Sequence, residues 1–337
     1  MTLSEAVPPE RSSVAQRPAT HPTARFAGAA VGFAAVFWSI YVVFVTTEPG
    51  QRLENTALVA SALRPDTTRA DSLTYLSGVS VASLVAAMAV VALVGMVRRR
   101  PGVRVLAVVV MGVSAVLAEA LKAVLPRPEL LDGPAWILRN SFPSGTATVA
   151  ASVGIAALMV APDRLRWLVL LAAAAVAAVV GQATQVTGWH RASDALGGVV
   201  LAASVGCAAL IVLARIDHVQ PSIVGRVHRR VYALIWIVAA AAIALGAAIL
   251  AIFLAFPLLR APDTAESVAL HTASDLIVFG LSTIAIAGFA WVIQPYTLGT
   301  STPPALPDAT EPPAEEAPAA EALGAEAATD PPDEAVG

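Results

Sequence analysis

A histidine and an aspartate four residues apart form the pair in this chain that is best suited to covalent chemistry. His190 precedes Asp194 in the segment Gly-Trp-His-Arg-Ala-Ser-Asp at 188–194. At the start of a helix this separation stacks the two side chains, so the carboxylate can orient and support the imidazole. A histidine held in this way can attack phosphorus and form a covalent intermediate. We therefore predict His190 as a nucleophile and Asp194 as its orienting partner.

Two further segments carry groups that bind anions. The Pro-Ser-Gly run that ends in Ser144 and Gly145 is typical of a helix start, where free N–H groups and the helix dipole attract an anion. Gly145 also lets the backbone approach a ligand closely. Lys122 and Arg127 can neutralise phosphate oxygens, and arginine can do so with two parallel hydrogen bonds. The three segments together have the composition of a phosphoryl-transfer site.

Long apolar runs must position these segments. Of the 337 residues, 57% are hydrophobic and 13% are charged, whereas soluble domains carry roughly 25% charged residues. Runs of ~20 apolar residues span the hydrocarbon core of a bilayer. We predict an all-α polytopic membrane protein with a six-helix core and two additional C-terminal helices. The predicted spans are Phe26–Thr46, Leu76–Val97, Val105–Val124, Thr146–Val160, Leu168–Val186, Ala195–Leu213, Tyr232–Leu254 and Leu276–Ile293.

The placement of arginine predicts the orientation. Cytoplasmic segments are enriched in Lys and Arg, and the triple arginine at 98–100 is the strongest such anchor. This bias puts both termini in the cytoplasm and all three chemical segments outside the plasma membrane. The predicted organisation is a disordered tail (1–24), the six-helix core (25–214), a cytoplasmic basic loop (215–231), two extra helices (232–294) and a disordered acidic tail (295–337).

The three segments, in this order, resemble the motifs of the type 2 phosphatidic acid phosphatase family. That family includes lipid pyrophosphate phosphatases, is related to vanadium haloperoxidases, and has the motifs K-x6-R-P, P-S-G-H and S-R-x5-H-x3-D. The resemblance covers roughly Leu76 to Leu213. It implies a six-helix core that hydrolyses lipid phosphates or diphosphates at the outer leaflet, through a phosphohistidine on His190. It also implies that Lys122, Ser144 and Gly145 hold the phosphate, without a metal or cofactor.

The sequence departs from the family pattern in the second motif. The family's general acid is a histidine, and Thr146 stands in its place. Threonine cannot donate a proton near neutral pH as imidazolium does, and general acid catalysis is worth ~10²–10⁴-fold. A diphosphate expels a better leaving group than a phosphate monoester does. We therefore expect a preference for lipid diphosphates such as polyprenyl diphosphate.

The phosphate-binding arginines also depart from the pattern. The third-motif serine and arginine fall at Ala183 and Thr184, and Arg127 follows Lys122 by five residues rather than seven. Arg127 and Arg191 are plausible substitutes by proximity. The chain alone leaves open which of them takes over.

The sequence also bears on other functions. Thr146 favours a catalytically inactive relative that binds lipid phosphate or scaffolds envelope proteins. An intramembrane serine protease using Ser144 and His190 is disfavoured, because Phe142 stands where such proteases have glycine. The haloperoxidase branch is disfavoured, because its activity needs an intact vanadate cage. A transporter is disfavoured as well, because the predicted spans hold no charged residue at mid-membrane depth other than Glu119. The basic residues form no patch that could bind nucleic acid.

Several polar residues lie in or beside the predicted spans. Glu119 is expected to pair with Lys122, one turn away. Gln182 and Gln185 share a face of the fifth span, where hydrogen bonds between helices explain them. The segment from His271 to Asp275 repeats the spacing of the His190 segment. It is either a coincidence or a source of the missing acid.

Overall fold

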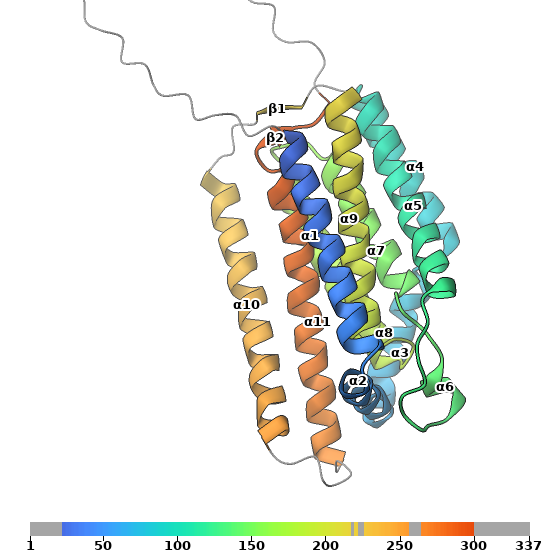
Figure 1. Ribbon diagram of the computed structural model, residues 1–337. Helices are drawn as coiled ribbons and strands as arrows, with labels where there is room; N and C mark the ends of the chain where they lie inside the picture. Colours follow the sequence, from blue (N-terminus) through green and yellow to red (C-terminus); the bar gives the residue numbers. More distant parts are fainter. Residues whose placement is uncertain (1–21, 217–218, 222–225, 256–263, 300–337) are drawn as a thin grey trace, which may run out of the picture. The chain divides into compact units, whose positions relative to one another are not determined.

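The computed structural model describes residues 22–216, 219–221, 226–255 and 264–299, which are almost entirely helical (Figure 1). Most of the two predicted tails lies outside the described residues. The helices are α1 (Pro22–Ile40), α2 (Glu48–Ala60), α3 (Asp66–Ser77), α4 (Val81–Val97), α5 (Pro101–Val124), α6 (Ala135–Leu138), α7 (Gly145–Val160), α8 (Arg166–Val186), α9 (Ala192–Ile216), α10 (Arg226–Ala255) and α11 (Thr264–Ile293). A π-helical turn (Tyr41–Val45) extends α1, and a 3-10 turn (Ser61–Leu63) follows α2. Two short strands, β1 (Gln220–Pro221) and β2 (Tyr296–Thr297), pair antiparallel.

The predicted fold class is confirmed, with differences in the individual spans. Six of the described helical segments are long and apolar enough to cross a membrane. A seventh span is possible from α3 and α4, which bend by 53° at their junction. The fourth predicted span is α7, which has only 16 residues. Each of the eight predicted spans coincides with described helical residues, but only six of them, or seven with the bent pair, are long and apolar enough to cross a membrane.

The core is built from small residues that let the helices approach closely. Helix α7 packs against α5, α8 and α9, and α1 packs along α9 (Figure 1). A β-carbon added at Gly154 of α7 would lie 2.8 Å from Ala173 of α8. One added at Gly206 of α9 would lie 2.7 Å from Ile155. Close approach of this kind gives dispersion contacts between helices that lipid cannot supply.

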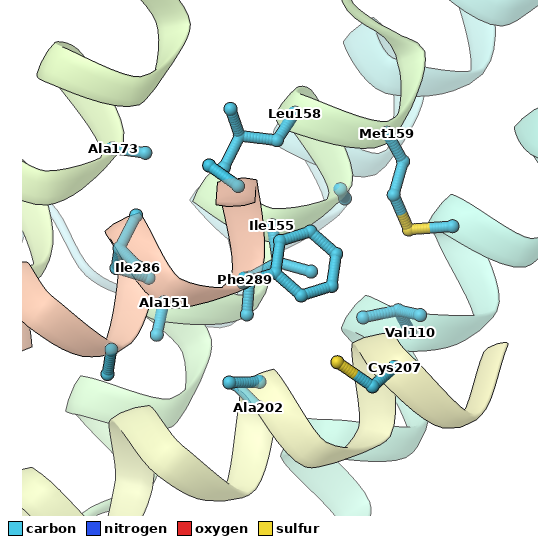
Figure 2. Packing of buried hydrophobic residues seen from close by; sticks show 14 of the residues in the cluster. Val110, Ala151, Ile155, Leu158, Met159, Ala173, Ala202, Cys207, Ile286 and Phe289 are labelled. Atoms are coloured by element: carbon cyan, nitrogen blue, oxygen red, sulfur yellow. The ribbon is translucent and has the colours of Figure 1, made fainter. Parts of the chain in front are cut away.

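The C-terminal helix α11 belongs to this core. It packs against α8, α9 and α2, and the ring of Phe289 lies between Ile155 of α7 and Cys207 of α9 (Figure 2). Hydrogen bonds also join it to α8, because Ser274 donates to Gln185 Oε1 (2.6 Å) and Gln182 donates to the Asp275 carbonyl (3.3 Å). The expected interhelical role of Gln182 and Gln185 is confirmed.

Two arginines bind carbonyl groups at and just beyond the C-terminal end of α11. Arg25 donates to the carbonyls of Trp291 and Val292, and Arg166 donates to the Tyr296 carbonyl at 2.8 Å. The last carbonyls of a helix lack partners within the helix and carry the negative end of its dipole. These bonds lie beside β1 and β2, at the opposite end of the helices from α2 and α6 (Figure 1).

Helix α2 was not predicted from the sequence. Thr47 begins it, because the Thr47 hydroxyl accepts a hydrogen bond from the Gly50 amide and Pro49 occupies the first turn. It is amphipathic and buries a stripe of residues three or four apart: Gly50, Gln51, Glu54, Ala57, Leu58 and Ser61. The polar residues of this stripe contact the first and third chemical segments, because Gln51 donates to the Pro128 carbonyl and Glu54 accepts from Ser193.

Candidate active site

The first and second segments meet where α5 ends and α7 begins. Lys122 Nζ lies 2.8 Å from Glu119 Oε1, so the expected pair forms. A β-carbon added at Gly145 would collide with Glu119 Oε1 and lie 3.7 Å from Lys122 Nζ. The bare backbone of Gly145 therefore makes room for the Glu119 carboxylate at the start of α7, beside Lys122. Ser144 is the N-cap, and its hydroxyl accepts the Ala147 amide at 3.3 Å.

Three side chains fix the loop that carries Arg127. Asn140 Nδ2 donates to the carbonyls of Lys122 (3.1 Å) and Leu125 (2.9 Å), which satisfies the end of α5. Tyr41 donates to the Pro126 carbonyl at 2.7 Å, and Gln51 of α2 donates to the Pro128 carbonyl at 2.7 Å. The loop is thus held by α1 on one side and by α2 on the other.

A tight turn after α8 presents His190. Gly188 adopts φ +72°, which glycine tolerates without strain. The amides of Trp189 and His190 both donate to the Thr184 carbonyl, at 3.0 and 3.1 Å. Thr184, which stands where the family has arginine, bonds its own hydroxyl to the Gly181 carbonyl. Its side chain therefore bonds back into α8, and its main-chain carbonyl holds the turn.

Asp194 is completely buried behind this turn. Its Oδ2 accepts hydrogen bonds from the Ser141 hydroxyl (2.6 Å) and the Arg191 amide (2.9 Å). His190 Nδ1 lies 3.5 Å from the same oxygen, which is longer than a tight hydrogen bond. Contacts between catalytic groups are often long before substrate binds. With Nδ1 toward Asp194, the second ring nitrogen of His190 faces away from the carboxylate.

The two candidate phosphate-binding arginines differ in what they contact. Arg191 is buried, and its guanidinium donates to Asn55 Oδ1 (2.9 Å), Ser141 Oγ (3.1 Å) and the Ile137 carbonyl. Both terminal nitrogens of Arg127 are buried, and none of the described residues accepts a hydrogen bond from them. Burial and the nearby Arg191 lower the pKa of Arg127, whereas Asp194 and Glu54 raise it. Arg127 therefore keeps two donors available for a ligand.

Glu54 of α2 is a site residue that the sequence reasoning missed. Its carboxylate accepts the Ser193 amide (2.7 Å) and the Ser193 hydroxyl (2.9 Å), at the start of α9. Burial, followed by the charge of Asp194, raises the pKa of Glu54 to about 7, while Ser193 and Arg127 act in the opposite direction. The signal in the sequence is only the spacing of Gln51, Glu54 and Leu58, which indicates an amphipathic helix without saying what it covers.

The remaining predicted residues have different surroundings. Thr146 is half-buried in the first turn of α7, directly after Gly145. His271 lines the same small cavity as His190. However, its Nδ1 lies 2.9 Å from the Ala57 carbonyl and its Nε2 lies 3.7 Å from Asp275. Both ring nitrogens of His271 thus face protein groups. Among the described residues there is no cluster of His, Cys, Asp or Glu that could hold a metal ion.

The fold defines an all-α, multi-pass membrane protein. Residues 103–218 match the model of the PAP2 superfamily. The resemblance recognised in the three segments is confirmed at this level. The fold is similar to that of a crystal structure described as the first transmembrane PAP2 type phosphatidylglycerolphosphate phosphatase from Bacillus subtilis. The two chains are 20% identical, the match covers 56% of this chain and 98% of that one, and the TM-score is 0.47. No curated protein matches the chain significantly.

Proposed function

We propose that this protein is an integral-membrane phosphatase that hydrolyses lipid phosphates, with lipid diphosphates such as polyprenyl diphosphate preferred. The observation that carries the proposal is the meeting of Lys122, Gly145 and the His190–Asp194 pair at one end of the helices. The match of residues 103–218 to the PAP2 superfamily model supports the class of reaction. The arginine distribution supports a site on the outer leaflet of the plasma membrane, with both termini in the cytoplasm.

In the proposed reaction the ring nitrogen of His190 that faces away from Asp194 attacks phosphorus. The nitrogen–phosphorus bond forms as the bond from phosphorus to the leaving oxygen breaks, and water later cleaves the phosphohistidine. Asp194 stabilises the positive imidazole through the Nδ1 side. Lys122, Arg127 and the amides at the start of α7 offset the charge on the phosphate oxygens.

The leaving group decides the substrate class. Thr146 occupies the place where the family has an acid, and its hydroxyl does not ionise near neutral pH. A phosphate monoester must expel an alkoxide, which needs a proton, whereas a diphosphate expels a phosphate group that is stable as an anion. We assign Thr146 a hydrogen bond to the leaving oxygen. We assign Arg191 a positioning role and not a phosphate contact, because its guanidinium already donates to Asn55 and Ser141.

Phosphate release by the purified full-length protein in detergent tests the proposal. We expect release from polyprenyl diphosphate to exceed release from phosphatidic acid, and to vanish in His190→Ala. Ser39→Ala is the matched control, because the Ser39 hydroxyl bonds only to a carbonyl of its own helix, Ala35, at 2.8 Å. Faster turnover of phosphatidic acid would contradict the diphosphate preference. Activity that survives in His190→Ala would contradict the phosphohistidine.

A second candidate is an inactive relative that binds lipid phosphate. Two observations favour it. Thr146 cannot act as a general acid, and the carboxylate of Glu119 lies against the proposed phosphate site at Gly145. The variant Thr146→His separates the two candidates. Release by Thr146→His, but not by the native protein, would identify a site that has kept phosphate binding and lost turnover.

A further inference from the structure

The carboxyl group of Glu54 is buried beside the proposed site and has no ionic partner among the described residues. Glu54 is only 5% exposed to solvent. Both of its hydrogen bonds come from Ser193, a neutral residue. None of the ion pairs between described residues includes Glu54. A buried carboxylate without a paired cation is costly, and such groups tend to hold a proton instead.

A small polar cavity connects Glu54 with the proposed nucleophile. Its volume is about 10 Å³, and its polar lining comes from Glu54, Gln185, His190, Arg191, His271 and Ser274. That volume is close to the minimum for one water molecule, and the lining offers several hydrogen-bond partners. The cavity places a carboxyl of α2, an imidazole of the third segment and an imidazole of α11 around one space.

Charged groups from two other segments act on Glu54, and titratable groups from two more line the cavity. Asp194 of α9 repels its negative charge, and Arg127 of the loop after α5 attracts it. His190 and Arg191 line the cavity from the turn before α9, and His271 lines it from α11. The other polar side chains of the buried stripe of α2, Gln51 and Ser61, carry no charge. The ionised form of Glu54 is therefore favoured by the two hydrogen bonds from Ser193 and, to a smaller extent, by the charge of Arg127. Arg127 is also the arginine with donors available for phosphate.

A phosphate group bound to Arg127 would change this balance in one direction. It brings at least one negative charge close to Glu54, and it engages the guanidinium that stabilises the ionised carboxylate. At short range and low local dielectric, both changes favour the protonated carboxyl. Burial already holds the pKa of Glu54 near 7, so a modest further rise changes its protonation at neutral pH.

We infer that Glu54 takes up a proton from solvent when the phosphate group of the substrate binds beside Arg127, and returns it when phosphate leaves. The inference rests on the proposed function, because it takes the site around Arg127 as the phosphate site. No bond to substrate is made or broken: the carboxylate and one solvent proton become a carboxylic acid. Helix α2 thereby supplies charge compensation to a site that lacks the histidine of the second motif and one arginine of the third.

Calorimetric titration of the full-length protein with tungstate tests the inference. Tungstate is a tetrahedral dianion that does not itself titrate near neutral pH, so any proton exchange belongs to the protein. Titrations at pH 7.5 in two buffers with different ionisation enthalpies give the number of protons taken up. We expect roughly half a proton per tungstate in the native protein. A carboxyl with a pKa of about 7 is about three-quarters ionised at pH 7.5, and a rise of its pKa by about one unit on binding would leave it about one-quarter ionised.

Two variants assign the proton to a residue. Glu54→Gln keeps an acceptor for the Ser193 amide, and it should bind tungstate with no dependence on the buffer. His271→Asn should retain the native uptake. Uptake that persists in Glu54→Gln, or that disappears only in His271→Asn, would overturn the inference.

A measurement on the native protein alone covers the case in which Glu54→Gln does not fold. Infrared difference spectra should show a protonated carboxyl band that appears with tungstate, and the absence of that band would overturn the inference. Tungstate binding without proton uptake would contradict the role of Glu54 and leave the proposed phosphatase intact. A native protein that neither binds tungstate nor releases phosphate would contradict the proposed function, and the inference with it.

Discussion

The amide of Ser144 donates a 2.8 Å hydrogen bond to the main-chain carbonyl of Asp194. This bond joins the backbone at the start of α7 to the backbone at the start of α9. Beside it, the Ser141 hydroxyl donates to the Asp194 carboxylate at 2.6 Å. The proposed phosphate-binding amides and the proposed nucleophile are therefore held relative to each other by one main-chain and one side-chain hydrogen bond.

Gly198 makes this junction possible, and its replacement should disrupt it. A β-carbon there would lie 2.7 Å from both the Ser144 carbonyl and Thr148 Oγ1, and 3.0 Å from the Thr148 amide. We expect Gly198→Ala to lower stability by about 1–3 kcal/mol, as overpacking does, and to lower phosphate release. Gly32→Ala in α1 is the matched control, since nothing lies within 4 Å of an added methyl group there. Thermal unfolding in detergent and initial rates check both; equal behaviour of the two variants would contradict the junction.

The sequence was sufficient to predict the spans and to bring the three chemical segments to one end of the helices. Apolar length identifies a span, and alternation between spans decides which loops share a side. The third segment could be predicted in detail as well, because the four-residue spacing of His190 and Asp194 is local. Nothing in that reasoning depends on which helices are neighbours.

The same reasoning could not predict α2 or the position of α11. Helix α2 is too polar to be recognised as a span. The role of Glu54 depends on its contact with Ser193, which is 139 residues away in the sequence. The apolarity of α11 identifies it as a span without saying that Phe289 enters the core between α7 and α9 (Figure 2). For the same reason, the choice between Arg127 and Arg191 required the contacts of both guanidinium groups.

Arg127 and Arg191 should respond to substitution in opposite ways. Arg127→Met removes two donors that no described residue uses, so we expect normal stability and a loss of tungstate affinity of about 10–100-fold, the worth of a hydrogen bond to a charged group. Arg191→Met removes bonds to Asn55, Ser141 and Ile137, and we expect it to cost about 3–5 kcal/mol of stability. Tungstate titration and thermal unfolding of both variants check this. The reverse pattern would assign phosphate binding to Arg191.

Glu119 should compete with phosphate for Lys122. The two side chains are 2.8 Å apart, and the Glu119 carboxylate is 65% exposed, so the pair is worth at most ~1 kcal/mol. Glu119→Gln keeps the shape of the side chain and frees the ammonium group. We expect tungstate affinity to rise by about 2–5-fold with little change in the maximal rate. A fall in the maximal rate of more than tenfold would instead show that Glu119 handles a proton in the reaction.

The contact between Arg64 and Asp275 should hold the segment after α2 against α11. Arg64 Nη2 lies 2.6 Å from Asp275 Oδ2, and both side chains are largely buried. Asp275→Asn should lower stability by about 1–3 kcal/mol, because it leaves the buried guanidinium without its ionic partner. Glu48→Gln, which breaks the exposed Arg52–Glu48 pair on α2, should change stability by less than ~0.5 kcal/mol. A double-mutant cycle with Arg64→Met measures the coupling, and a coupling near zero would contradict the contact.

Glu54 should make the protein less stable as pH rises through neutrality. The pKa of its carboxyl is about 7 in the folded protein, against an ordinary value of 4.5. Between these values the folded state holds a proton that the unfolded state has released, so stability falls as pH rises from about 4.5 through 7. The limit of this effect is about 3 kcal/mol.

The melting temperature measured from pH 5 to pH 8 checks this dependence. Glu54→Gln cannot ionise, and it should therefore decline less over this range than the native protein does. It should also be the more stable of the two at pH 8, where the native carboxylate is buried and charged. The exposed Glu48 on the same helix provides the comparison, since Glu48→Gln should retain the native slope. Parallel curves for the native protein and Glu54→Gln would show that Glu54 is ionised at all these pH values, and that its contacts with Ser193 are those of a carboxylate.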